Sequence, residues 1–304
     1  MKDNCISGYV VNRIRLFISL MIVFFCLSLN AQNKKALLIG ISDYPQIGDD
    51  SWNTIHGVND VELLSVTLKK QGFKISKLTD KRATANNIRK EFSSFVEDAK
   101  NGDVVYLHFS GHGQPVEDLD WDEDDGWDEA LIPYDAMKKP EKGVYEGENH
   151  IIDDELNTYL RDLRTKVGDN GFVYVVIDAC HAGSSYRGEV EDTPTRGTNI
   201  GFSARGKLFT PPIVKSGRIK IEDLDNSSAI CILEACRSYQ VNSEIRQEDT
   251  FYGPLSFYIN KVLQTNRLGK NIDWTDDVRK CMETDMRLIR QNMVIESNIL
   301  SREP

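Results

Sequence analysis

The sequence predicts an α/β protein in which a mostly parallel central β-sheet of about six strands has helices on both faces. Several short runs, such as residues 172–177, are continuously apolar and rich in β-branched or aromatic residues, which is typical of strands buried on both faces of a parallel sheet. These runs alternate with segments whose apolar residues recur at helical spacing. Two of the runs end abruptly in polar residues and glycines, where open α/β sheets place their ligands.

The predicted elements follow one another in a regular order. The predicted strands are residues 35–42, 73–79, 103–109, 172–177 and 229–235. The predicted helices begin at or near Asn59, Ile88, Asp153, Gly253 and Trp274. The first of them has Glu62 three positions after Asn59, as in a capping box, and the last is expected to end near residue 295. Residues 184–225 are rich in Gly, Pro, Thr and Arg without a period, so we expect a long mobile loop there.

Residues 1–31 have the composition of a secretory signal peptide. Arg13 and Arg15 precede an apolar run over residues 16–27, and small residues follow before residue 32. The run is shorter than the roughly 18 to 20 residues that a membrane span needs, although an uncleaved anchor stays an alternative. We therefore expect one folded domain over residues 32–304, exported to the periplasm or secreted, with no stable membrane span after removal of the signal.

Charge and cysteine content narrow the function classes. The formal net charge of −10 argues against nucleic acid or an anionic membrane surface as a partner. Cys231 and Cys236 are expected on one strand, facing opposite sides, and we interpret them and Cys281 as small buried hydrophobic residues. No disulfide framework is predicted.

A histidine and a cysteine follow two of the predicted strands. His112 lies between Gly111 and Gly113 after one strand, and Cys180 lies in the sequence DACHAG after another. A thiolate attacks a carbonyl far better than a thiol, and His112 is able to take the proton of Cys180 and later protonate a leaving amine. His181 is adjacent to Cys180 and points to the opposite side of an extended chain. From these residues alone, a His–Cys hydrolase and two core residues at strand ends both stay open.

These motifs carry a family resemblance. The pairing of SGHG with DACHAG, with DGWDEALIPYD and IIDDEL between them, resembles the caspase-like cysteine peptidases, and among these the metacaspases rather than the animal caspases. The resemblance runs from about residue 35 to about residue 268. It implies a caspase-like three-layer sandwich, a catalytic dyad of His112 and Cys180, and an oxyanion hole made by the backbone N–H groups of Gly113 and Cys180. The chemistry would need no cofactor.

A specificity pocket for a cation is expected beside the thiol. Asp178 precedes Cys180 by two positions and so lies on the same side of the strand end, where an uncompensated carboxylate is costly unless a cation binds. The resemblance adds Asp60 and Ser110 to this pocket and implies Arg or Lys at the cleavage site of peptide or protein substrates. The alternatives are a plain helix-start acid for Asp60 and a carboxylate that caps backbone amides for Asp178.

The predicted loop after the cysteine is a candidate for self-processing, as in a zymogen. An enzyme that cuts after Arg or Lys would find basic residues there, namely Arg187, Arg196, Arg205, Lys207, Lys215 and Arg218. The alternative is an ordinary surface loop.

Residues 117–129 hold nine acids in thirteen positions. Such density repels itself unless it is solvated or bound to a cation. Counted from Asp120, Gly126 falls seventh rather than sixth, so this is not an EF-hand loop. The resemblance implies calcium activation through Asp128, Asp153 and Asp154, whereas Arg187 stands where a further acidic ligand is expected. Calcium binding and a solvated loop with helix-capping acids both stay open.

We therefore predict a cysteine endopeptidase that hydrolyses peptide bonds after Arg or Lys and, by resemblance, works as a monomer. A related peptidase similar to clostripain or gingipain would use the same chemistry. The alternative from another class is a catalytically silent caspase-fold module that binds or scaffolds, which should tolerate loss of Cys180.

Overall fold

The computed structural model describes residues 33–46, 48–121, 123, 125–180, 193–198, 200–209 and 221–299. The chain divides into two units, residues 1–33 and 34–304, and every element below belongs to the second. The expected signal peptide, Arg187 and much of the expected mobile loop lie outside the described residues. Within the described part of the chain, no helix is long and apolar enough to cross a membrane.

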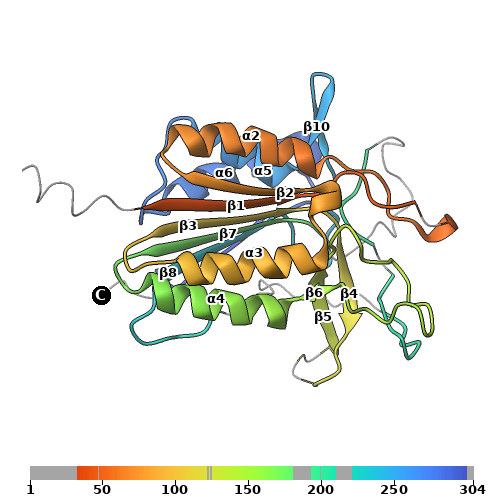
Figure 1. The fold of residues 1–304 in the computed structure, drawn as a ribbon. Helices are drawn as coiled ribbons and strands as arrows, with labels where there is room; N and C mark the ends of the chain where they lie inside the picture. Colours follow the sequence, from red (N-terminus) through yellow and green to blue (C-terminus); the bar gives the residue numbers. More distant parts are fainter. Residues whose placement is uncertain are drawn as a thin grey trace, which may run out of the picture. The chain divides into compact units, whose positions relative to one another are not determined.

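A six-stranded sheet forms the middle layer (Figure 1), in the order β11-β8-β7-β3-β1-β2. Its strands are β1 (Lys34–Gly40), β2 (Lys74–Thr79), β3 (Val104–Ser110), β7 (Phe172–Asp178), β8 (Ala229–Glu234) and β11 (Val294–Ser297). The first five are parallel, and β11 pairs antiparallel with β8. The predicted α/β class with a mostly parallel sheet is confirmed.

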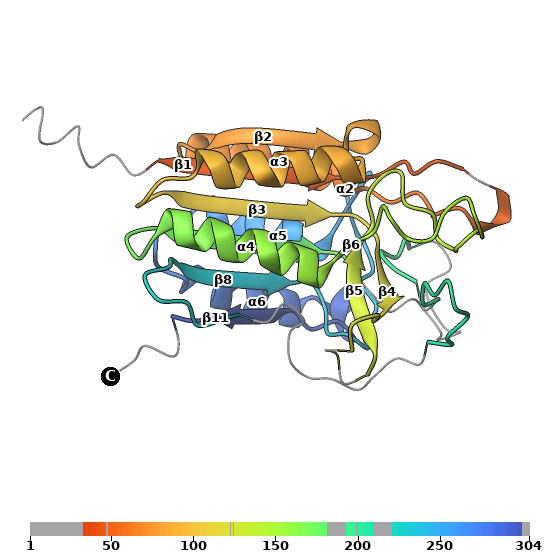
Figure 2. The ribbon, with the colours of Figure 1, turned by 60° about the horizontal axis from the view of Figure 1, so that its bottom comes forward.

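Helices cover both faces of the sheet (Figures 1 and 2). One face packs against α2 (Gly57–Lys70), α5 (Pro254–Leu263) and α6 (Trp274–Thr284), and the other against α3 (Ala85–Asp98) and α4 (Asp153–Val167). Along β1, Leu37 and Ile39 enter the core with α3 and α4, whereas Leu38 enters the core with α2 and α5. This alternation is what a strand buried on both faces requires.

The carboxyl-terminal end differs from the prediction. The helix expected to reach residue 295 ends at Thr284, and a 3-10 turn, η3 (Met286–Leu288), and strand β11 follow. The prediction is wrong because Val294 and Ile295 pair with Glu234 and Leu233 of β8. That pairing joins residues about 60 positions apart, and local periodicity does not reveal it.

The start of α2 also differs and brings an acid to the edge of the sheet. The helix begins at Gly57 rather than Asn59, and its N-cap residue, His56, makes no side-chain cap hydrogen bond. Gly57 lies so close to the end of β3 that a Cβ there would collide with the Ser110 carbonyl oxygen. This close approach places Asp60, in the first turn, beside the carboxyl ends of β1 and β3.

Smaller elements surround that edge. A three-stranded antiparallel sheet contains β4 (Gly113–Glu117), β5 (Trp127–Leu131) and β6 (Ile151–Ile152), and a hairpin contains β9 (Ile245–Gln247) and β10 (Thr250–Tyr252). Two further 3-10 turns are η1 (Gly48–Asp50) and η2 (Asp80–Arg82). The sequence did not predict the three-stranded sheet, although β4 begins directly after His112 and β6 leads into α4.

Candidate active site

The histidine and the cysteine emerge at the same edge of the sheet. Strands β3 and β7 are neighbours, and Ser110 pairs directly with Asp178. His112 and Cys180 each lie two residues beyond these strand ends, and their exposed fractions are 1% and 0%. The topology therefore brings to one edge of the sheet two residues that lie 68 positions apart in the sequence.

The imidazole of His112 is held in one tautomer. Its Nε2 lies 2.8 Å from the carbonyl oxygen of Asn53, and a carbonyl only accepts, so Nε2 carries the proton and Nδ1 has the lone pair. The ring stacks on Trp52 with 4.8 Å between centroids, and the hydroxyl of Tyr44 accepts a hydrogen bond from the His112 backbone N–H. Burial lowers the pKa of His112 to about 4, which leaves it neutral at pH 7. A neutral ring with a free lone pair is suited to accept a proton.

The thiol of Cys180 is turned toward a different acceptor. Its Sγ donates to the carbonyl oxygen of Gln240 at 2.8 Å, while Nδ1 of His112 has no hydrogen-bond partner. Cys236 donates to the same carbonyl at 3.5 Å. The expectation that Cys231 and Cys236 share one strand is wrong, because β8 ends at Glu234 and Cys236 continues past it to contact Cys180.

Two backbone amides point at one oxygen atom. The N–H groups of Cys180 and Gly113 donate to the carbonyl oxygen of Arg196 at 2.8 and 3.4 Å. An oxyanion hole requires this convergence of two donors on a single carbonyl oxygen. These are the two amides that the resemblance assigned to it.

The expected pocket residues lie together around a cation from the chain itself. Asp60, Ser110 and Asp178 are each 0% exposed, and so is Arg196. The Arg196 Nη1 lies 2.8 Å from Asp60 Oδ2 and 3.5 Å from Asp178 Oδ1, and it donates to Ser110 Oγ at 2.6 Å. A Cβ at Gly253 would collide with Asp178 and with Nη1, so this glycine forms the wall of the pocket.

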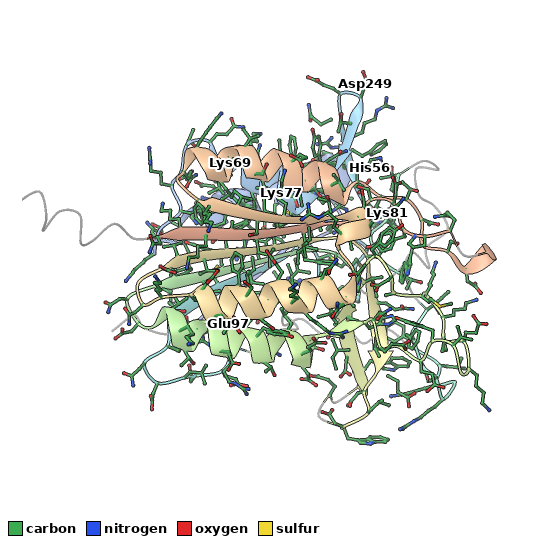
Figure 3. All side chains as sticks on the ribbon, in the orientation of Figure 1. His56, Lys69, Lys77, Lys81, Glu97 and Asp249 are labelled. Carbon is green, nitrogen blue, oxygen red and sulfur yellow. The ribbon has the colours of Figure 1, made fainter. Side chains whose placement is uncertain are left out.

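A third acid, Glu244, completes the pocket and was missed in the sequence. Its Oε1 accepts from Arg196 Nε and Nη2 at 3.0 and 2.8 Å. Its Oε2 contacts Nδ1 of His56, which lies at the amino end of α2 (Figure 3). Glu244 sits in a polar loop just before β9 with no recognisable motif around it, so no local signal identified it.

Asp178 accepts hydrogen bonds from the start of a helix and also lies near Arg196. Its Oδ2 accepts from the backbone N–H and the hydroxyl of Ser256, in the first turn of α5, at 2.8 and 2.6 Å. Its Oδ1 accepts from Asn242 Nδ2 at 2.8 Å and is the oxygen nearer to Arg196. The carboxylate thus caps backbone amides and faces the cation at the same time.

The charges in the pocket act on one another. Burial raises the pKa of Asp60 to about 7, although the Arg196 guanidinium opposes the rise. Burial alone would also raise the pKa of Glu244, but Arg196 and the hydrogen bonds from His56 outweigh it and lower that pKa. The three carboxylates raise the pKa of Arg196, against the effect of its burial, so it stays charged. The three carboxylates therefore keep the Arg196 guanidinium charged in this buried site.

The acidic run forms a second cluster near β5 and the start of α4. Burial, followed by the charges of Asp153 and Asp118, raises the pKa of Asp128 to about 8, and its buried Oδ1 has no hydrogen-bond partner. Burial and the charge of Asp154 likewise raise the pKa of Asp153 to about 7. The orphaned oxygen and the crowded carboxylates are features of a cation site. Among the described residues, which omit Asp122 and Asp124, no group of three potential ligands is close enough to hold a metal ion.

Comparison with known proteins identifies the class to which this fold and site belong. Residues 33–300 match the sequence profile of the family described as "Caspase domain". The chain belongs to this family of cysteine peptidases. Within it the chain is metacaspase-like: it is 34% identical over 195 residues to "Metacaspase-1" of Coccidioides immitis and 36% identical over 194 residues to "Metacaspase-1B" of Aspergillus fumigatus.

The two metacaspases are longer proteins. Each alignment covers 60% of this chain but only 36% and 41% of the respective relative. Among solved structures, protein GSU0716 from Geobacter sulfurreducens has a TM-score of 0.59 at 20% identity, covering 87% of this chain and 93% of that one. That structure supports the fold alone.

Proposed function

We propose that the protein is a cysteine endopeptidase that hydrolyses peptide bonds after Arg or Lys, with Cys180 as nucleophile and His112 as base. One observation carries the proposal. Arg196 lies in the site with its guanidinium among three buried acids and its carbonyl oxygen facing two N–H donors. A bound substrate would have to satisfy the pocket and the oxyanion donors in the same way.

The residues supply each step of the reaction. The Cys180 thiol turns from Gln240 toward Nδ1 of His112, gives up its proton and attacks the substrate carbonyl. The N–H groups of Gly113 and Cys180 stabilise the oxyanion. His112 then protonates the leaving amine, and water hydrolyses the acyl-enzyme to restore the thiol.

The pocket favours Arg over Lys. A guanidinium reaches Asp60 with one nitrogen and Glu244 with two others, as Arg196 does. A lysine ammonium has a single nitrogen and therefore contacts only one side of the pocket at a time. We expect kcat/KM for Arg peptides to exceed that for Lys peptides by about 10-fold, the effect of one hydrogen bond to a charged group.

Fluorogenic peptides ending in Arg, Lys or Asp test the proposal. We expect cleavage after Arg and, more slowly, after Lys, and a loss of about 10³-fold or more with Cys180→Ala. Cysteine 281, which lies on α6 and is half-buried, gives the matched control Cys281→Ala, expected to keep full activity.

A silent caspase-fold module that binds or scaffolds is the second candidate. It is favoured by the absence of a hydrogen bond at His112 Nδ1, since the thiol donates elsewhere. Peptide hydrolysis equal in wild type and Cys180→Ala, or absent from both, would support this candidate.

We also propose that Ca²⁺ binds the second acidic cluster through Asp128, Asp153 and Asp154 and activates the enzyme. The support is the resemblance, the orphaned Asp128 oxygen and the raised pKa values of Asp128 and Asp153. A calcium ion would supply positive charge that stabilises these carboxylates. Export through a signal peptide over residues 1–31, and activity as a monomer, are further proposals that rest on the sequence.

A further inference from the structure

Two thiols meet at one carbonyl oxygen beside the catalytic histidine. The Sγ atoms of Cys180 and Cys236 donate to the Gln240 carbonyl at 2.8 and 3.5 Å, and the two cysteines pack against each other. Both are buried, with exposed fractions of 0% and 1%. Peptide hydrolysis uses only the thiol of Cys180, so it gives no role to the second thiol.

The order of the strands places the two cysteines side by side. Cys180 lies two residues beyond the end of β7, and Cys236 lies two residues beyond the end of the parallel neighbour β8. The Ala235 N–H still donates to the Ile177 carbonyl at 3.0 Å, so the pairing continues past the ladder. Continued in this way, the register puts Cys236 level with Ala179, one residue from Cys180. Strands about 4.8 Å apart with an offset of about 3.3 Å separate the two Cα atoms by about 6 Å, within the range that disulfides span.

The thiol of Cys180 is turned toward Cys236 rather than toward the base. Nδ1 of His112 has the lone pair that hydrolysis needs, but the thiol donates to Gln240 and leaves that nitrogen without a hydrogen-bond partner. Rotation of the Cys180 side chain therefore separates two arrangements. Turned toward His112, the sulfur is placed to attack a substrate; turned toward Gln240, it lies against a second thiol.

The other described cysteines do not reach the nucleophile. Cys231 pairs with Tyr174 within the ladder of β7 and β8, and Cys281 lies on α6. Both belong to the core on the face of the sheet that α5 and α6 cover. Of these three cysteines, only Cys236 contacts Cys180.

From this geometry we propose that Cys236 is a resolving cysteine, which closes a disulfide on the oxidised Cys180, and that hydroperoxides thereby switch the peptidase off reversibly. The loss of activity rests on the proposed function, because the disulfide consumes the nucleophile. A sulfur bound in a disulfide has no thiolate to attack a carbonyl. The disulfide also protects Cys180, since thiols do not restore a sulfinic or sulfonic acid.

The two thiols supply the two electrons that reduce one hydroperoxide. His112 Nδ1 takes the Cys180 proton, the thiolate sulfur bonds one peroxide oxygen, and the O–O bond breaks. The departing oxygen takes the proton from His112 and leaves as water or an alcohol. The Cys236 sulfur then attacks the sulfenic sulfur of Cys180, and the sulfenic hydroxyl leaves as water with the Cys236 proton. An external dithiol returns both cysteines to thiols by exchange.

Peptide mapping by mass spectrometry tests the disulfide independently of peptide hydrolysis. The full-length protein is reduced, treated with hydrogen peroxide, alkylated and digested without reductant. We expect a linked pair of peptides that carry Cys180 and Cys236 in wild type and in the control Cys281→Ala, and no such pair in Cys236→Ser. A link from Cys180 to any other cysteine, or no link at all, would overturn the resolving role.

Hydrolysis of an Arg peptide, measured for each variant relative to its own reduced form, tests the switch. Peroxide should lower wild-type activity by about 10-fold or more, because the thiolate is lost, and dithiothreitol should restore most of it. Cys236→Ser should also lose activity, but dithiothreitol should restore much less, since its Cys180 proceeds to sulfinic acid. Cys281→Ala should behave as wild type does. Equal recovery of Cys236→Ser and wild type would contradict the switch.

The outcomes separate this inference from the proposed function. Reduced wild type that hydrolyses Arg peptides, but forms no link between Cys180 and Cys236 in peroxide, overturns the inference and leaves the peptidase standing. A link that forms without loss of hydrolysis overturns the switch and also removes Cys180 as the nucleophile. A link in a protein that hydrolyses no peptide even when reduced supports the disulfide pair and overturns the proposed function.

Discussion

The protein has two clusters of buried carboxylates, and they differ in what stands opposite them. In the pocket, Asp60, Asp178 and Glu244 surround the guanidinium of Arg196. In the acidic run, Asp128 and Asp153 face other acids, and in the described part of the chain no Lys or Arg pairs with either. Burial raises the pKa of Asp60 and of Asp128 alike, to about 7 and about 8. Crowded acids alone therefore do not define a site; the difference lies in whether the chain supplies the cation.

Removal of a pocket acid should have the largest effect on activity. Glu244→Gln and Asp60→Asn each break a buried charge contact to the substrate cation, which costs about 2–5 kcal/mol, or about 30- to 4000-fold in kcat/KM for Arg peptides. Asp249→Asn, at the exposed tip of the β9–β10 hairpin (Figure 3), is the matched control and should leave kcat/KM unchanged. Equal kcat/KM for Glu244→Gln and wild type would contradict the assignment of Glu244 to the pocket.

Removal of the Arg196 side chain should leave the pocket, like the acidic run, with buried carboxylates that face only other acids. In the Cys180→Ala background, which removes the proposed nucleophile, Arg196→Ala leaves three buried acids without their cation and should cost about 3–5 kcal/mol, or about 10 °C in Tm. The folded-state pKa of Asp60 is raised, so its contribution to stability is present below its unfolded pKa of about 3.9 and is lost as pH rises through about 7. Without Arg196 that pKa rises further.

The destabilisation by Arg196→Ala should therefore grow between pH 5 and pH 8. Thermal unfolding at both pH values measures it, with Arg205→Ala as the control. A loss of Tm that is the same at both values would mean that packing, rather than charge, accounts for the effect.

These two clusters also show which features of the fold and of the site could be predicted from the sequence. Buried strand runs that stop at Ser110 and Asp178 predicted the sheet and the edge where the site lies, because that signal is local. Glu244 was not predicted, and Arg196 was named only as one of several basic residues in a loop, because their pairing is a contact between loops 48 residues apart in the chain. Strand β11 was mistaken for helix for the same reason, since its pairing with β8 is a tertiary contact.

A cation bound from solution should balance the charge of the acidic run, as Arg196 balances the charge of the pocket. The pKa of Asp128 in the folded protein is raised to about 8. The stability that this carboxyl group contributes is therefore fully present below its unfolded-state pKa and is lost as pH rises through about 8. In chelator at pH 9, Asp128→Asn should raise Tm by about 2–4 °C, since solvent screening leaves about 1 kcal/mol of the repulsion. At pH 5 it should change Tm little.

Calcium should reverse the sign of the difference in Tm between Asp128→Asn and wild type. If the cluster binds Ca²⁺, the ion stabilises wild type by mass action and Asp128→Asn loses the gain. Glu97→Gln, exposed on α3 (Figure 3), is the control and should respond to calcium as wild type does. A wild-type Tm that calcium leaves unchanged, in a titration up to millimolar concentration, would remove calcium from the proposal.

The smallest effect is expected from the residue that holds Glu244 in place. His56 Nδ1 contacts Glu244 Oε2, and this hydrogen bond raises the pKa of His56. His56→Ala should lower kcat/KM for Arg peptides by about 3- to 10-fold, the value of one partly exposed hydrogen bond, and should do so mainly through KM.

The pH profile distinguishes this positioning role from a packing role. Because the folded-state pKa of His56 is raised, the charged pair with Glu244 is present at low pH and is lost as pH rises through that pKa. The deficit of His56→Ala should therefore shrink toward high pH, and His56→Gln, which keeps a donor, should restore part of the activity at every pH. A deficit that is constant with pH and that His56→Gln does not relieve would mean that stacking of His56 on Phe251, with 5.1 Å between ring centroids, is what orders the pocket wall.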